Sequence, residues 1–349
     1  MASIKNIFDF SEVFDIKSPF SNWISENSLK KEELDTKYLS VVRVEGPFNE
    51  KGEMIKYISR NHEYYYLASL NKTITSINIE KIKWAVSYDD DNAEKSFYLF
   101  SGGVLHQNKI KIKLQSTLGK KKFKVYAYTG NVPINGISVD VKFKHSIAFF
   151  IGGAGDSKKY LGQGPTFIAR DEVAIPFSSI APIENYSFKY LGYDDIYKDS
   201  KIKKNVLPLI ESKEGTAIYI VGHSLGGWNG AHLSQILSDK GYSIELLLTL
   251  DPVGTKVGVT LISDIYWATP KPKSNYWINI YANPDSDEID DYIAWGGGQW
   301  IPNKNSVDVF HEVKYHHRHA GKMFKEIVKD GNSSSDILLS TIEKFLQEK

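Results

Sequence analysis

The chain has 349 residues, of which 42% are hydrophobic and 24% are charged, a composition typical of a globular protein. The 43 lysines and arginines are balanced by 42 acidic residues, so the net charge of +1 does not indicate binding to nucleic acid or to an anionic membrane. The absence of cysteine excludes disulfides, thiol catalysis and cysteine-ligated zinc. The length is sufficient for two domains.

The first 20 residues carry acidic side chains and lack a basic head followed by an apolar core, so we expect no cleavable signal peptide. The longest apolar runs are shorter than the roughly 20 residues that span a bilayer. The sequence therefore leaves the compartment open. The protein is either cytoplasmic or secreted by a route that uses no signal peptide.

Residues 1–135 contain short segments rich in β-branched and aromatic residues, separated by turn-forming residues. Strands of this length and spacing are typical of an antiparallel sandwich. We therefore predict a smaller all-β domain over residues 1–135, with a sandwich fold of the immunoglobulin-like kind. The expected strands are 38–44, 64–67, 74–79, 83–88, 97–100, 110–114 and 123–128.

The pattern changes after a boundary at about residues 131–136, where expected strands alternate with expected helices. This alternation predicts an α/β domain over residues 136–349, with a mostly parallel sheet and helices on both faces. Residues 146–151 are almost all apolar, as expected of a strand that is covered on both faces. Further strands are expected at 217–221, 245–250, 276–282 and 307–313, and helices at about 200–211, 225–239, 319–328 and 335–346.

Residues 217–228 read Ala-Ile-Tyr-Ile-Val-Gly-His-Ser-Leu-Gly-Gly-Trp, an apolar strand followed by Gly-x-Ser-x-Gly and a segment that can begin a helix. This order is typical of a nucleophile elbow, a strained turn that lifts a serine hydroxyl off the edge of a sheet. Glycines on either side of the serine allow the strand and the helix to approach each other. We therefore expect Ser224 to be a nucleophile.

A serine hydroxyl needs a base, and the base must be held in one tautomer by a third group. The best candidate is His317, with His316 and His319 as alternatives, because these residues follow the last expected strand. Active sites of open α/β sheets lie at this edge. His223 is set aside because it is fixed beside Ser224 on a turn that points the two side chains apart. The histidine cluster has no carboxylates at ligand spacing, so we expect no metal.

Two aspartates are candidates for the third group. Asp251 directly follows the strand that ends at residue 250, and Asp285 follows the next strand. Both preserve the chain order of serine, acid and histidine. Asp251 is preferred, with Asp285 as the alternative, because Pro252 ends the strand and fixes the loop.

An oxyanion requires backbone N–H groups that are in place before charge develops. Leu225, which follows the nucleophile at the start of a helix, is expected to supply one of them. The second is expected from Gly153 or Ala154, in a glycine-rich turn after the strand 146–151. This turn lacks the Lys-Ser/Thr ending of a phosphate-binding loop, and no cofactor is expected.

These residues resemble the α/β-hydrolase superfamily over roughly residues 140–330. The run Gly-His-Ser-Leu-Gly-Gly, with Leu-Asp-Pro at 250–252, is similar to lipases, some of which place the acid after this earlier strand. The resemblance implies ester hydrolysis through an acyl-enzyme, in which Ser224 attacks, His317 shuttles the proton and Asp251 orients the histidine. Residues 1–135 have no counterpart in simple hydrolases.

The whole arrangement also resembles bacterial lipase-type effectors that are delivered into rival cells, including those of type VI secretion. This resemblance implies a lipid or phospholipid ester as substrate, transient membrane contact, and a secretion-machinery or immunity partner, but no nucleic acid. Two other functions stay open: an amidase or thioesterase with the same triad, and a binding protein on an inactive hydrolase scaffold. Residues 292–300, which mix glycine and tryptophan without a period, are expected to form a mobile flap over the cleft or a long surface loop.

Overall fold

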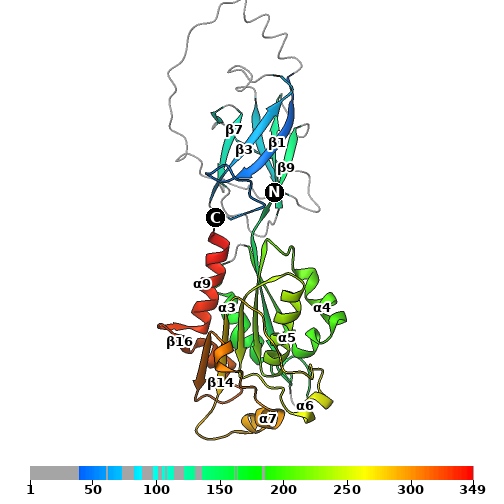
Figure 1. Ribbon diagram of the computed structural model, residues 1–349, viewed down its shortest axis with the longest axis vertical. Helices are drawn as coiled ribbons and strands as arrows, with labels where there is room; N and C mark the ends of the chain where they lie inside the picture. The colour runs from blue at the N-terminus through cyan, green and yellow to red at the C-terminus, as the bar shows by residue number, and fades with distance from the viewer. Residues whose placement is uncertain are drawn as a thin grey trace, which may run out of the picture. The chain divides into compact units, whose positions relative to one another are not determined.

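The computed structural model divides the chain into two compact units, coloured mostly blue to cyan and green to red in Figure 1. Among the described residues, the first unit extends to Lys142 and the second runs from Phe143 to Glu348. The described residues are 39–59, 62–72, 82–88, 97–100, 104–106, 108–113, 122–129, 136–160, 162, 164–182 and 185–348.

Antiparallel β-sheets form the first unit, as the sequence predicts. The four-stranded sheet has the order β1 (Val41–Phe48), β3 (Glu63–Leu70), β7 (Lys109–Lys113) and β6 (Val104–His106). The five-stranded sheet has the order β2 (Tyr57–Ile58), β9 (Ile137–Phe143), β8 (Lys122–Tyr128), β4 (Lys83–Tyr88) and β5 (Phe97–Phe100).

Alternate residues of β3 and β7 are buried, because successive side chains of a strand point to opposite faces. On β7, Ile110 and Ile112 are buried and the lysines beside them are more exposed. β9 pairs with β8, so the first unit extends beyond residue 135. The strand expected at 74–79 lies outside the described residues.

A six-stranded parallel sheet forms the centre of the second unit, as predicted. All residues of two interior strands, β10 and β12, are buried, which explains why both read as nearly continuous apolar runs. The order of the sheet is β11 (Tyr186–Gly192), β10 (His145–Gly152), β12 (Thr216–His223), β13 (Ser243–Leu250), β14 (Trp277–Ala282) and β15 (Val309–Val313).

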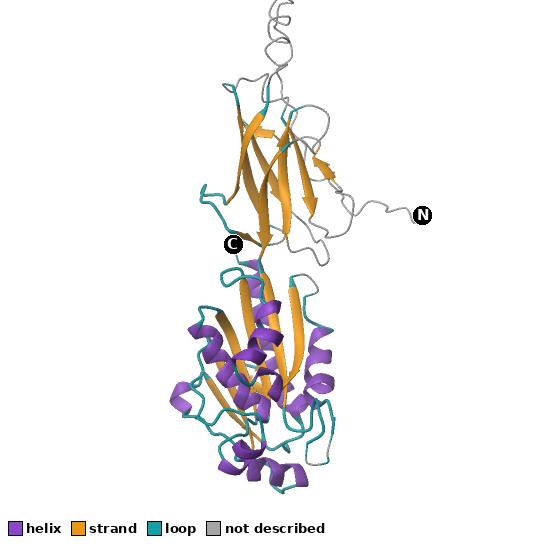
Figure 2. Cartoon of the chain, turned by 90° about the vertical axis from the view of Figure 1, so that its right-hand side faces the viewer, coloured by secondary structure: helices purple, strands orange, loops and turns teal. Residues whose placement is uncertain are grey.

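Helices cover both faces of this sheet, as Figure 2 shows. Successive residues of β10 point into different cores: Phe149 packs in one hydrophobic cluster and Phe150 in the other. The first cluster includes residues of α4 (Asp199–Asn205) and α5 (Leu225–Asp239), and the second includes residues of α3 (Ile175–Ser178), α8 (Ala320–Lys325) and α9 (Ser334–Gln347).

Among the elements that differ from the sequence-based expectation are β11, α4 and α8. β11 was not expected, because this edge strand has a mixed polar sequence and several of its residues are only partly buried. α4 ends at Asn205, before a 3-10 turn over Leu207–Leu209, since Pro208 cannot donate a helical hydrogen bond. α8 ends at Lys325, short of the expected residue 328.

Two further helices follow the carboxyl ends of strands: α6 (Val257–Ile262) comes after β13 and α7 (Ile289–Gly297) after β14 (Figure 1). The segment 292–300, expected as a flap or a surface loop, is therefore helical as far as Gly297. Within the described ranges, no helix has both the length and the apolar character needed to cross a membrane.

Candidate active site

Ser224 lies on a tight turn between β12 and α5. Its φ of 57° and ψ of −127° place it in a backbone region that non-glycine residues rarely adopt. The turn is held by neighbouring strands and loops: the Ser224 N–H donates to the Leu250 carbonyl at 3.1 Å, and the Val253 N–H donates to the Ser224 carbonyl at 3.1 Å. Only 7% of Ser224 is exposed. The strain is thus maintained by the contacts that surround the turn.

Two glycines permit the close packing around this turn. A Cβ atom on Gly222 would collide with the backbone of Gly226, so the strand and the helix could not approach each other as they do. A Cβ atom on Gly153 would lie 2.5 Å from Cβ and 3.0 Å from Oγ of Ser224. The backbone of the loop after β10 therefore lies directly against the serine side chain.

Three residues far apart in the chain form a continuous series of hydrogen bonds, and we call them the triad. Oγ of Ser224 lies 2.9 Å from Nε2 of His317, and Nδ1 of His317 lies 2.6 Å from Oδ2 of Asp251. The second contact requires the imidazole to carry a proton on Nδ1, which leaves Nε2 free to accept the serine proton. The structure therefore brings together the preferred serine, acid and histidine.

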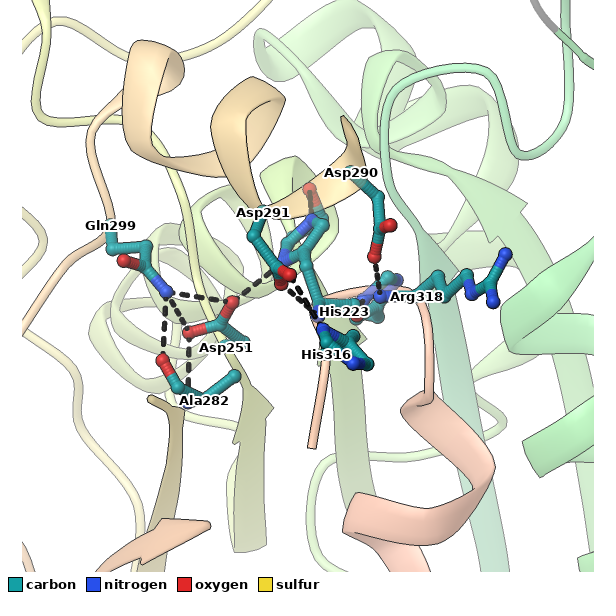
Figure 3. Close-up of polar contacts among 10 residues, drawn as sticks. His223, Asp251, Ala282, Asp290, Asp291, Gln299, His316 and Arg318 are labelled. Carbon is teal, nitrogen blue, oxygen red and sulfur yellow. Dashed lines mark hydrogen bonds and ion pairs between the residues drawn. The ribbon is translucent and has the colours of Figure 1, made fainter. Parts of the chain in front are cut away.

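Backbone contacts hold His317 on both sides. Its N–H donates to Oδ1 of Asp291 at 2.8 Å, and its carbonyl accepts from Nε2 of His223 at 2.8 Å. His223 lies at the end of β12 and Asp291 lies on α7, and both are labelled in Figure 3. The rings of His223 and His317 are also close, with centroids 4.8 Å apart. His223, set aside by the sequence reasoning, thus has a structural part in the site.

Burial, together with the nearby His317, lowers the pKa of His223 to about 3. His223 is therefore neutral at physiological pH, with a proton on Nε2 for the His317 carbonyl. Since the folded-state pKa lies below the ordinary value of about 6.5, the unfolded chain binds this proton first as the pH falls. The stability contributed by neutral His223 is present above about pH 6.5 and is lost progressively toward pH 3.

We expect the free energy of unfolding to fall more steeply with acid in the wild type than in His223→Gln, which keeps an N–H donor. Protonation of His223 in the unfolded chain accounts for about 2 kcal/mol of additional loss of unfolding free energy in the wild type between pH 7 and pH 5. Urea unfolding of both proteins at the two pH values measures it. An identical loss in both would show that His223 is not held neutral.

Asp251 is completely buried and makes a full set of contacts for an ionised carboxylate. Its oxygens accept from the Ala282 N–H at 3.1 Å and from Nε2 of Gln299 at 2.9 and 3.1 Å, in addition to His317 (Figure 3). Sequence reasoning missed Gln299, because a single glutamine after a glycine run carries no motif.

The alternative acid and bases lie elsewhere. Asp285 is 84% exposed in relative side-chain area and pairs with Lys314 at 3.4 Å. Nδ1 of His316 donates to Oδ2 of Asp291 at 2.7 Å, and this hydrogen bond raises the pKa of His316. His319 precedes α8, and burial lowers its pKa. Among the described residues, no hydrogen bond connects any of these three side chains to Ser224.

The expected oxyanion donors occupy suitable places. Leu225 is the first residue of α5, where backbone N–H groups have no partner within the helix. Gly153 lies against the serine side chain, and Ala154, the next residue, packs beside the first core cluster. The distances to a bound oxyanion are a property of the complex, so the choice between Gly153 and Ala154 stays a prediction.

A buried carboxyl group, also missed by the sequence reasoning, shapes the loop that contains Gly153. Asp156 accepts from the hydroxyl of Tyr190 at 2.8 Å and from the Ala169 N–H at 3.2 Å. Burial raises the pKa of Asp156. These contacts connect the loop to β11 and to the helical segment that follows, and so fix the backbone beside Ser224.

No protein-family model matches the chain, and no curated protein is similar to it in sequence. Within the described part of the chain, no group of three or more His, Asp or Glu side chains is arranged to hold a metal ion. The parallel sheet and the triad are therefore the observations from which a function can be argued.

Proposed function

We propose that the second unit is a serine hydrolase of the α/β-hydrolase type that cleaves carboxyl esters through an acyl-enzyme. The observation that carries this proposal is the series of hydrogen bonds from Ser224 through His317 to buried Asp251. Such a series activates a serine because the imidazole accepts the hydroxyl proton while the carboxylate stabilises the resulting imidazolium. The position of Ser224 on a strained turn between a parallel strand and a helix also supports the proposed hydrolase activity.

In the proposed reaction, Oγ of Ser224 attacks the ester carbonyl as its proton passes to Nε2 of His317. The N–H of Leu225 and that of Gly153 or Ala154 hold the oxyanion. His317 then gives its proton to the leaving alcohol, and the acyl group remains on Ser224. A water molecule, deprotonated by His317, attacks the acyl-enzyme; the bond to Oγ then breaks, His317 returns the proton to Ser224, and the acid is released.

The surface of α6 and α7 supports an ester with long acyl chains, such as a lipid or phospholipid. These helices follow β13 and β14, the strands whose ends hold Asp251. Large apolar side chains gather on their outer faces, among them Ile289 at 80% and Trp295 at 69% exposure. The others are Val257, Leu261, Ile262, Tyr292 and Ile293. An apolar surface of this kind favours contact with acyl chains or a lipid surface.

Delivery as an antibacterial effector, with a secretion-machinery or immunity partner, is a proposal that depends on the resemblance alone. Hydrolysis of amides or thioesters uses the same triad, so only substrates can separate it from ester hydrolysis. A binding protein on an inactive scaffold would need none of the triad's hydrogen-bond geometry.

A fluorophosphonate probe and a panel of acyl esters test the proposed function. We expect the probe to label the native wild type on the peptide that contains Ser224 and to leave the heat-unfolded protein unlabelled, because only the folded triad activates the hydroxyl. We expect p-nitrophenyl esters to be hydrolysed, with kcat/KM rising from acetyl to decanoyl esters. Labelling with turnover of amides or thioesters alone would redirect the proposal to those bonds. No labelling and no turnover would leave a binding protein.

A further inference from the structure

Helix α7 reaches the triad at both of its ends. The residues just inside its amino end contact the loop that carries His317, and the segment after its carboxyl end contacts Asp251. A mobile flap would lack such contacts with the groups that it covers. α7 is therefore connected to two members of the triad, one at each of its ends.

At the carboxyl end, the side chain of Gln299 is the donor. Its Nε2 lies 2.9 and 3.1 Å from the two oxygens of Asp251 and 3.0 Å from the Ala282 carbonyl. Three acceptors around one atom require that atom to be the amide nitrogen. The backbone is also fixed here, because Val253 and Gln299 form an antiparallel bridge and the Trp300 N–H donates to the Pro252 carbonyl at 2.7 Å.

At the amino end, two carboxylates hold the histidine loop. Asp291 accepts from the His317 N–H at 2.8 Å, and Asp290 accepts from the Arg318 N–H at 2.9 Å (Figure 3). Burial alone would raise the pKa of Asp291, but the backbone donors of Glu288 and His317 together with the His316 side chain outweigh it and lower that pKa. Asp291 is therefore a carboxylate, able to accept hydrogen bonds from the loop.

We propose that α7 and the residues after it as far as Gln299 form a fixed positioning clamp for the triad. In this clamp, Gln299 orients Asp251 and Asp291 orients His317. The inference rests on the proposed function, because it assigns these residues a role in hydrolysis. Neither residue is a catalytic residue: each acts through a member of the triad. α7 stays in place during turnover, and the substrate enters without displacing it.

The first test replaces Gln299 with leucine. Because the buried carboxylate then loses a donor, we expect kcat for p-nitrophenyl butyrate to fall about 10- to 100-fold while KM changes little. Asp291→Ala is expected to lower kcat about 10-fold, since the His317 N–H loses its acceptor. Matched controls are Gln235→Leu, in α5 about 15 Å along the helix from Leu225, and Asp287→Ala, which is exposed in the same acidic run.

The Gln299→Glu variant tests the positioning role through the pH dependence of kcat, which a purely structural role of Gln299 would leave unchanged. Its carboxyl group would face the carboxylate of Asp251, and two such groups at this distance share one proton at lower pH. We expect activity on the acid side, where the shared proton acts as the donor, and a new fall in kcat as the pH rises and that proton leaves. A profile with the wild-type shape would overturn the role of Gln299.

The second test asks whether α7 must move. The guanidinium of Arg318 lies 3.1 Å from the carboxylate of Glu288, at the start of α7, and both side chains are accessible. The chain has no cysteine of its own, so Glu288→Cys/Arg318→Cys can be joined by a short bis-maleimide without side reactions. We expect the cross-linked protein to keep the kcat of the same variant before cross-linking. A loss of 10-fold or more would show that α7 opens as a lid and would overturn the proposal.

The outcomes separate the two proposals. A wild type that reacts with the fluorophosphonate and hydrolyses esters, with Gln299→Leu and Asp291→Ala at wild-type kcat, overturns the clamp and leaves the proposed function standing. A wild type that does neither overturns both. Thermal unfolding of each variant, measured beside its control, identifies any loss of activity that comes from a loss of folding.

Discussion

Replacement of Ser224 by alanine is expected to lower kcat for a carboxyl ester by about 10⁴-fold or more, because the nucleophile that would form the acyl-enzyme is removed. Fluorophosphonate labelling should disappear in the same variant. The loss should come from chemistry, since alanine has a smaller side chain and fits the site of a residue that is only 7% exposed. Steady-state kinetics with p-nitrophenyl butyrate and intact-mass analysis after labelling measure both effects.

The matched control is Ser340→Ala, which removes an exposed hydroxyl from α9. It should keep wild-type kcat and labelling. Ser224→Ala should retain the thermal unfolding temperature of the wild type within a few degrees, because its backbone strain and its backbone hydrogen bonds are unchanged. Residual labelling of Ser224→Ala at the wild-type rate would show that another residue is the nucleophile.

Replacement of His317 by alanine is expected to lower kcat by about 10⁴-fold, because His317 is the proposed base and lies 2.9 Å from Oγ of Ser224. The backbone contacts of His317 with Asp291 and His223 do not depend on its side chain, so the loop should stay in place. Kinetics on an ester substrate across pH 5 to 9 measure the effect. The kcat of His317→Ala should stay below that of the wild type at every pH in this range, since no other base replaces the imidazole.

The neighbouring histidines provide the comparison. His316→Ala and His319→Ala should each retain kcat within about 10-fold of the wild type, because the former contacts Asp291 and the latter precedes α8. The His316 change removes a contact from the clamp, so its effect should be the larger of the two. A greater loss in either variant than in His317→Ala would contradict the assignment of the base.

The class of fold followed directly from the sequence. β10 and β12 are buried on both faces, and this burial demands the continuous apolar runs by which they were recognised. The first unit was recognised by its short segments rich in β-branched and aromatic residues, which form antiparallel strands in the structure. β11 was not predicted from the sequence, because an edge strand is only partly covered and does not need a continuous apolar run.

The helix α7 shows where periodicity is misleading. Its outer face carries Ile289, Tyr292 and Trp295, whereas the buried residues include Asp291. A helix whose carboxylate faces inward, because it binds the His317 loop, reverses the pattern that indicates a surface helix. Three consecutive glycines, Gly296–Gly298, also favour a loop on local propensity.

The proposed nucleophile and the preferred acid could be predicted from local patterns, because each requires its own turn: Gly-x-Ser-x-Gly around Ser224, and a proline directly after Asp251. The base could not. His316, His317 and His319 occupy one short loop, and the sequence, although it favours His317, leaves the other two open as alternatives. Only the tertiary structure selects His317, because contacts from Asp291 and from His223, 26 and 94 residues away in the chain, fix the direction in which this loop presents its side chains.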